Sequence, residues 1–204
     1  KKKKKIIEDS YVPPYYLLLN YNLNSQKSDH DLIDNIKPIL KFAAQDTLIG
    51  LVAKHLKQIP IIAGITLNYT KKMKASEKPS GAQKFHRDLH DKSLMHLVIP
   101  IYDLDKNCGP FTYIDAITSD KIINSLRHKG GRIEDRIIYK FANEENIVKI
   151  TGQAGQAHFM SPYYSIHCGG RVKKNFRLLL IISYGAPNLA VESEGFLNRK
   201  IFQE

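Results

Sequence analysis

Two histidines and one aspartate stand out because their types and spacing suit metal coordination. His86 and Asp88 are separated by one residue, so on an extended segment their side chains point to the same side. An imidazole and a carboxylate placed in this way can bind one metal ion. A third ligand must come from elsewhere in the chain, and His167, close to a later predicted strand, is the candidate.

Two histidines and a carboxylate on one face of an octahedron form the facial triad of non-haem Fe(II) oxygenases, which leaves the other positions open. Those positions can take O₂ and a 2-oxo acid that chelates through two atoms. Arg177 follows His167 by ten residues within a predicted strand. Its guanidinium can pair with a distal carboxylate through two hydrogen bonds, as the tail of 2-oxoglutarate requires. Beyond the metal ligands we predict no catalytic residue.

Some alternatives remain open at this point. Asp88 and His90 are also separated by one residue, in reversed order, and we favour His86 with Asp88 because the aromatic Phe85 precedes them. His96 lies inside an apolar predicted strand and is interpreted as a core histidine rather than a ligand. The alternative for the whole set is a barrel with scattered polar residues and no metal, or a degenerate, non-catalytic barrel.

Three motifs, in this order, resemble the phytanoyl-CoA dioxygenase-like family. Residues 85–88 are similar to its aromatic-His-x-Asp, and residues 107–114 to its N-x-G-P turn with the strand that follows. Residues 155–184, with His-Cys-Gly-Gly-Arg from position 167 and then Arg177, are similar to its C-terminal motif. Together the motifs place the resemblance over about residues 60–185.

The resemblance implies a double-stranded β-helix and an Fe(II)- and 2-oxoglutarate-dependent dioxygenase, a hydroxylase that releases succinate and CO₂. It implies His86, Asp88 and His167 as metal ligands and Arg177 as the 2-oxoglutarate anchor. The chain departs from the family at residues 115–118, where Pro-Gly-Ser-His is usual, and at Gly169, where a serine is usual. Thr112 is predicted to replace that serine in contacting 2-oxoglutarate.

The elements that must position these residues are helices first and strands afterwards. Apolar residues recur at helical spacing over 32–43, with Ser28-Asp29 as the cap and Pro38 expected to kink or split the run, and again over 46–57. Residues 15–24 are expected to form an extended segment or edge strand. We predict a helix at 120–128 capped by Thr118 or Ser119, and strands at 61–69, 94–102, 111–114, 147–150, 156–160 and 176–184.

This order predicts a mainly β fold with N-terminal helices, which the resemblance narrows to a double-stranded β-helix (jelly-roll, cupin-like) barrel. We expect residues 1–27 to be a basic tail and extended segment, and 28–204 to be one oxygenase domain. Within that domain we expect a helical layer at 28–59, the β-helix core at 60–185 and a C-terminal tail at 186–204. The loop 71–84 and the helix 120–128 are candidate lids.

The chain of 204 residues carries 31 Lys and Arg against 20 Asp and Glu, a net charge of +11. Five of the basic residues form the run at 1–5, and only seven of the 31 are Arg. Because nucleic-acid recognition depends strongly on arginine, this balance makes nucleic acid an unlikely partner. Lysines in the loop before His86 favour a small, anionic substrate. The alternative function is a non-catalytic basic β-barrel that binds an anionic ligand or nucleic acid.

Cellular location is predicted from what the sequence lacks. Cys108 and Cys168 are too few and too far apart for a zinc motif. Glu8-Asp9 follows Ile6-Ile7 directly, so we expect no signal peptide, and no apolar run reaches the ~18 residues of a membrane span. We therefore predict a cytoplasmic protein that is not in a membrane. The substrate and the oligomeric state are not predicted.

Overall fold

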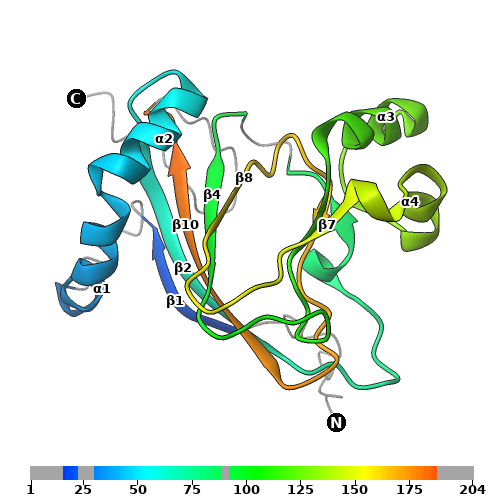
Figure 1. Ribbon diagram of the computed structural model, residues 1–204, viewed down its shortest axis with the longest axis horizontal. Coiled ribbons are helices and arrows are strands. Elements are labelled where there is room, and N and C mark those ends of the chain that lie inside the picture. Colours follow the sequence, from blue (N-terminus) through cyan, green and yellow to red (C-terminus); the bar gives the residue numbers. More distant parts are fainter. Residues whose placement is uncertain (1–15, 23–29, 89–91, 188–204) are drawn as a thin grey trace, which may run out of the picture.

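The computed structural model of the chain describes residues 16–22, 30–88 and 92–187 (Figure 1). The lysine run at 1–5, the predicted cap at Ser28-Asp29, the His90-Asp91 pair and most of the predicted C-terminal tail lie outside these residues. The described part consists of two antiparallel sheets with helices on both sides. Helices α1 and α2 lie beside one sheet, and α3 and α4 beside the other.

Two helices form the N-terminal layer, as the apolar spacing predicts. Helix α1 spans His30–Ala43 and α2 spans Asp46–Leu56. Pro38 lies inside α1. We expected this proline to kink or split the helix, and it does not split it. Helix α2 ends where Lys57 adopts a left-handed conformation with φ of 58°, a frequent helix stop.

The first sheet, sheet A, has the strand order β1-β2-β10-β4-β8. Its strands are β1 Tyr16–Asn22, β2 Ile61–Lys71, β10 Phe176–Gly185, β4 Met95–Pro100 and β8 His158–Met160. All neighbours pair antiparallel. β1 lies at an edge of the sheet, which confirms the prediction of an edge strand.

The second sheet, sheet B, has the order β6-β3-β9-β5-β7 and is built from very short strands. These are β6 Arg132–Ile133, β3 Phe85–His86, β9 His167–Cys168, β5 Thr112–Ile114 and β7 Ile147–Lys149. The mainly β architecture with N-terminal helices is thus as predicted. In the residues described, the strands form two separate sheets rather than a closed barrel.

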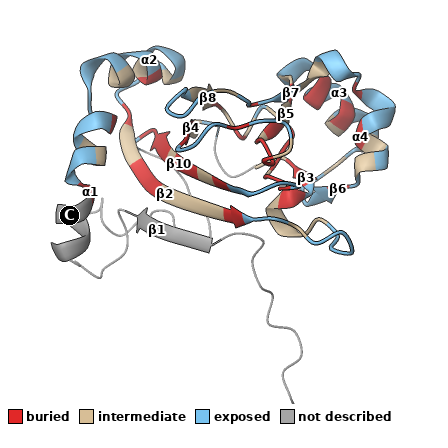
Figure 2. Ribbon diagram, turned by 60° about the horizontal axis from the view of Figure 1, so that its bottom comes forward, coloured by how far each residue is buried: buried red, intermediate tan, exposed pale blue. Residues whose placement is uncertain are grey.

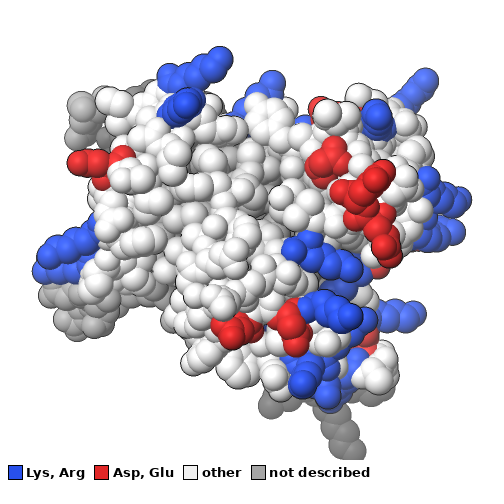
Figure 3. Space-filling view, viewed as in Figure 1, with Lys and Arg blue, Asp and Glu red and all other residues white. Residues whose placement is uncertain are grey.

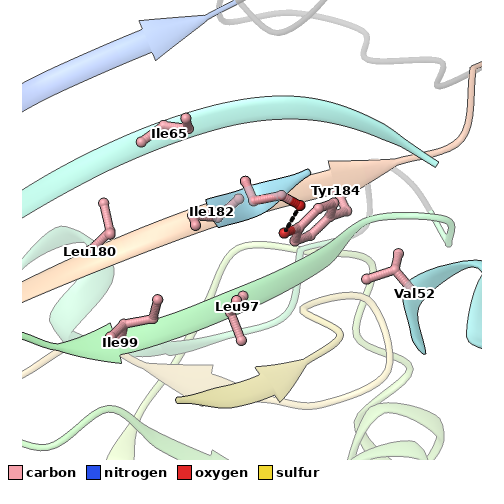
Figure 4. Packing of buried hydrophobic residues seen from close by; sticks show 8 residues of the cluster. Val52, Ile65, Leu97, Ile99, Leu180, Ile182 and Tyr184 are labelled. Carbon is pink, nitrogen blue, oxygen red and sulfur yellow. Dashed lines mark hydrogen bonds between the residues drawn. The ribbon is translucent and has the colours of Figure 1, made fainter. Parts of the chain in front are cut away.

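Three apolar clusters hold these layers together; buried residues are red in Figure 2. The first joins α1 and α2 to one face of sheet A through residues such as Val52, Leu97 and Ile182 (Figure 4). The second joins α3 and α4 to one face of sheet B. The third lies on the opposite face of sheet A, which we call the inner face, and includes Val98, Leu179, Met160 and Phe111.

Two helices differ from the sequence-based expectation. Helix α3 spans Ala116–Leu126 rather than 120–128, because the carboxylate of Asp115 caps it by accepting from the Thr118 N–H at 2.8 Å. Helix α4, Asp135–Phe141, was not predicted. Two 3-10 turns, η1 Gly81–Gln83 and η2 Glu144–Asn146, complete the described elements. No helix in the described ranges is long and apolar enough to cross a membrane.

The buried Tyr184 ties β10 to the end of α1. Its hydroxyl donates to the Ala43 carbonyl at 2.9 Å (Figure 4), and that carbonyl belongs to the last turn of a helix, where it has no partner within the helix. We expect Tyr184→Phe to lower the free energy of unfolding by about 1–3 kcal/mol, because a buried acceptor loses its donor. Urea denaturation measures this. Tyr102→Phe, on a 55% exposed side chain, should change it little, and equal losses in both variants would contradict the role of the hydrogen bond.

Candidate functional site

The pairing of β3 with β9 places two imidazoles side by side. His86 is directly opposite His167 in this antiparallel pair, and residues opposite one another in a sheet share a face. The two ring centroids are 4.3 Å apart. Phe111 stacks on the His167 ring, with a centroid distance of 5.4 Å, and so links this position to the inner-face cluster.

Asp88 completes the group that the sequence predicts. Its two carboxylate oxygens lie 3.6 Å from His86 Nε2 and 3.7 Å from His167 Nε2. One ligand atom from each residue lies within 4.8 Å of the others, a spacing that suits a single metal ion. The histidine side chains are buried, whereas the Asp88 side chain is 34% exposed. The group is therefore accessible from the aspartate side.

Backbone carbonyls orient both rings for metal binding. Nδ1 of His86 lies 2.8 Å from the Lys84 carbonyl, and Nδ1 of His167 lies 2.9 Å from the Ser165 carbonyl. A carbonyl can only accept, so each Nδ1 carries the proton and each Nε2 presents its lone pair toward Asp88. Burial lowers the pKa of His86 to about 4 and also lowers the pKa of His167. Both imidazoles are thus neutral near pH 7, which is the form that binds metal.

One turn contacts both ligand-bearing segments. The Pro162 carbonyl accepts from the Asp88 N–H at 3.1 Å, and the Tyr163 carbonyl accepts from Nε of Arg87. The Ser165 carbonyl of the same turn is the partner of His167. Arg87 also reaches Asp120 on α3 at 2.8 Å, with only 8% of its side chain exposed. Arg87 therefore fastens the segment between the two ligands His86 and Asp88 to its surroundings, a role that the sequence analysis missed.

The segment after His167 is fixed to the turn before His86. The Gly169 N–H donates to the Ala82 carbonyl at 2.6 Å, and Gln83 Nε2 donates to the Gly170 carbonyl at 3.1 Å. Arg171 closes the connection by donating from Nε to the Gln83 carbonyl at 2.8 Å, while its other nitrogens pair with Asp135. Both ligand strands are thus held at both ends.

Arg177 is a buried cation with no acidic partner among the described residues. Its side chain donates to the Gly109 carbonyl at 3.1 Å and to the Thr70 hydroxyl at 3.0 Å, and its Nε has no hydrogen-bond partner in the described part of the chain. Burial lowers its pKa to about 10, so it remains charged at pH 7. A buried, unpaired charge is costly unless a ligand of opposite sign compensates it. Arg177 is therefore suited to bind an anion.

Thr112 is not on the face of sheet B that carries the metal-ligand histidines. It lies opposite Cys168 on β5, whereas its neighbour Tyr113 lies opposite His167, so the Thr112 side chain is on the other face of sheet B. Its hydroxyl donates to the Pro110 carbonyl at 3.2 Å.

Cys108 and Cys168 are buried free thiols, and burial raises the pKa of Cys168 to about 11. We assign these thiols no chemistry.

No protein-family model matches the sequence, and no curated protein is similar to it in sequence. Solved structures are similar in fold. EctD from S. alaskensis with 2-oxoglutarate and 5-hydroxyectoine is 16% identical, with a TM-score of 0.55, over 82% of this chain and 59% of that one. The non-heme alpha ketoglutarate dependent epimerase SnoN from nogalamycin biosynthesis is 13% identical, with a TM-score of 0.50, over 84% and 61%.

A third similar structure is HygX from Streptomyces hygroscopicus with nickel and 2-oxoglutarate bound. It is 13% identical, with a TM-score of 0.52, over 83% of this chain and 72% of that one. This chain spans about three fifths of the length of EctD and SnoN. Likeness at this identity establishes the fold, which is the jelly-roll fold of these 2-oxoglutarate-dependent proteins, and so confirms the predicted fold class.

Gly170 lets the chain pass close to Arg177. A Cβ at this position would lie 2.5 Å from Arg177 Nη1 and 2.3 Å from the Gly109 carbonyl oxygen. We expect Gly170→Ala to destabilise the fold by about 1–3 kcal/mol, because one of these groups must move. Thermal or urea unfolding measures it. Gly50→Ala in α2, where nothing lies within 4 Å, should instead stabilise by ~0.5–1 kcal/mol. A neutral Gly170→Ala would refute the close approach.

Arg87→Gln tests the positioning of the ligand segment. The shorter side chain cannot reach both Tyr163 and Asp120, so we expect the affinity for Zn(II) to fall about tenfold, as when supporting groups of a metal site are removed. Competition with a chromophoric chelator measures it. Arg136→Gln is the matched control, because the Arg136 side chain is 79% exposed and pairs with the neighbouring Glu134. The assignment fails if both variants bind Zn(II) as the wild type does.

Proposed function

We propose that the protein is an Fe(II)- and 2-oxoglutarate-dependent dioxygenase that hydroxylates a small molecule. The observation that carries this proposal is the presence, in one jelly-roll fold, of the His86-Asp88-His167 group and the buried, uncompensated guanidinium of Arg177. The donor set fits Fe(II), since two imidazoles and one carboxylate leave coordination positions free. The guanidinium fits a dicarboxylate whose other end chelates the metal.

Each residue has a defined part in this proposal. His86 and His167 would offer Nε2, already oriented by the carbonyls that receive their Nδ1 protons, and Asp88 would offer a carboxylate oxygen. Arg177 would bind the distal carboxylate of 2-oxoglutarate. The bound iron supplies the O₂ chemistry that protein side chains lack. In the overall reaction 2-oxoglutarate loses CO₂ and becomes succinate with one oxygen atom of O₂, and the other atom enters a C–H bond as hydroxyl.

We also propose that the protein belongs to the phytanoyl-CoA dioxygenase-like family. The three resembling motifs support it, since they supply the ligands His86, Asp88 and His167 and the anchor Arg177. Thr112 is left out of the proposed 2-oxoglutarate site, because its side chain is on the far face of sheet B and bonds its own backbone.

We propose an anionic small molecule as the substrate. A pocket of about 400 Å³ is lined by Lys72, Lys74, Lys173 and Arg171, with Glu77 as its acidic member. Arg171 connects this pocket through Gln83 to the segment that packs on Arg177. On the face seen in Figure 3, basic side chains lie around the periphery and are interspersed with acidic ones. That pattern favours a local anion site over an extended nucleic-acid surface.

The test is the conversion of 2-oxoglutarate to succinate. With Fe(II), O₂ and 2-oxoglutarate, we expect purified protein to form succinate slowly without substrate and faster when a substrate is added. Asp88→Ala and His86→Ala should lower the rate by at least ~100-fold, because the metal loses a ligand. Mass spectrometry of succinate measures the rate. A wild type that binds neither metal nor 2-oxoglutarate would contradict the proposal and leave the non-catalytic binding module as the explanation.

Arg177→Leu separates the anchor from the metal ligands. In this variant we expect metal affinity close to that of the wild type and a KM for 2-oxoglutarate raised about 10- to 100-fold, the range for a lost charge-assisted pair. Thr112→Val serves as the comparison and should leave this KM unchanged. If Arg177→Leu bound 2-oxoglutarate normally, another residue would have to be the anchor.

A further inference from the structure

His96 pairs with Ser183 on the inner face of sheet A. The two residues lie opposite one another on β4 and β10, and Ser183 Oγ is 2.9 Å from His96 Nδ1. Because side chains alternate along a strand, His96 lies on the same face of β4 as Val98. Val98 belongs to the inner-face cluster, and Phe111 of that cluster contacts the metal ligand His167. His96 therefore points into the space between the two sheets, not toward α1 and α2.

Consecutive residues connect His96 to the candidate metal group. His96 is opposite Met160 on β8. The next residue, Ser161, donates to the Leu94 carbonyl at 3.3 Å, and the one after it, Pro162, accepts from the Asp88 N–H at 3.1 Å. The start of β4 and the ligand Asp88 are thus held by adjacent residues. The electrostatic effect of Asp88 and His167 on the pKa of His96 agrees with this proximity.

The hydrogen bond defines which nitrogen of His96 carries the proton. Ser183 is buried and has no other partner in the described part of the chain, so its hydroxyl hydrogen is satisfied only by donating to Nδ1. Burial lowers the pKa of His96 to about 4, and the ring is neutral. The single ring proton is then on Nε2, which makes Nε2 a donor.

This donor is not used within the described structure. Nε2 of His96 has no hydrogen-bond partner among the described residues, and the side chain is only partly buried. The Nε2 atoms of His128 and His158 also lack partners among the described residues, but those two atoms are buried. His96 instead presents one oriented, neutral donor beside the metal group. The sequence-based interpretation of His96 as a core histidine accounts for Nδ1 but not for Nε2.

We propose that His96, oriented by Ser183, recognises the substrate by donating a hydrogen bond from Nε2 to one of its oxygen atoms. The proposal rests on the proposed oxygenase function and narrows it. The substrate then carries a hydroxyl, carbonyl or carboxylate oxygen close to the carbon that is oxidised, and is not an unsubstituted alkyl chain at that point. His96 acts in specificity and takes no part in binding metal or 2-oxoglutarate.

The test uses protein loaded with Zn(II) and 2-oxoglutarate, which is diamagnetic and does not turn over. The probes are 1-hexanol, which has an acceptor oxygen, and 1-chlorohexane, which has the same chain and a poor acceptor. With ¹⁵N-labelled histidine we expect the His96 ring to be neutral with its proton on Nε2, and 1-hexanol to shift that signal. The Kd for 1-hexanol should rise about tenfold in His96→Leu, and that for 1-chlorohexane should not.

Further variants separate recognition from folding. His96→Gln restores a donor near the same place and should recover most of the affinity, and Ser183→Ala should lose the defined tautomer. His55→Leu, on the exposed side of α2, is the control. Equal 1-hexanol binding by the wild type and His96→Leu, or no binding by either, overturns the proposal. The same samples report whether the wild type binds Zn(II) and 2-oxoglutarate. If it binds neither, the proposed function is contradicted as well. If it binds both, that function stands whatever the result for His96.

Discussion

The antiparallel register between β3 and β9 is the constraint on which the rest of the site depends. Each strand has only two residues, yet their pairing sets His86 opposite His167 and so places two neutral imidazoles on one face. Such short strands have few ladder hydrogen bonds of their own. Their register is therefore held from outside, by the turn that receives Asp88, Arg87 and His167 on one side and by the contacts of Gln83 and Gly169 on the other.

A second constraint is the buried positive charge of Arg177. Removing a guanidinium from water without a carboxylate partner costs several kcal/mol, and the described residues offer it only two neutral oxygens. The long pairing of β10 with β2 stabilises the sheet and so offsets this cost. It fixes Arg177 opposite Thr70. The glycine at 170 allows the backbone to close over the guanidinium. An anionic ligand would replace the interactions with water that the guanidinium has lost. The same buried charge therefore lowers the stability of the ligand-free fold and raises the affinity for an anionic ligand.

The sequence predicts those parts that depend on local pattern. Periodicity predicts α2, β2, β4 and β10, because long amphipathic or apolar segments carry a clear repeat. Spacing and resemblance together select His86, Asp88, His167 and Arg177, and the structure brings the first three together. Helix α3 was placed too late because Asp115, not Thr118, is its cap, and α4 was missed because seven residues give little periodicity. Arg87 and the free donor of His96 depend on contacts between distant segments, which no local pattern reveals.

We propose that the two histidines and Asp88 hold one metal ion while Arg177 holds the distal carboxylate of 2-oxoglutarate. A crystal structure with Mn(II) and 2-oxoglutarate, with anomalous scattering to locate the metal, tests it most directly. We expect one Mn(II) coordinated by Nε2 of His86, Nε2 of His167 and an oxygen of Asp88, with 2-oxoglutarate extending from the metal to Arg177. An ion at another position, or a 2-oxoglutarate tail away from Arg177, would contradict it.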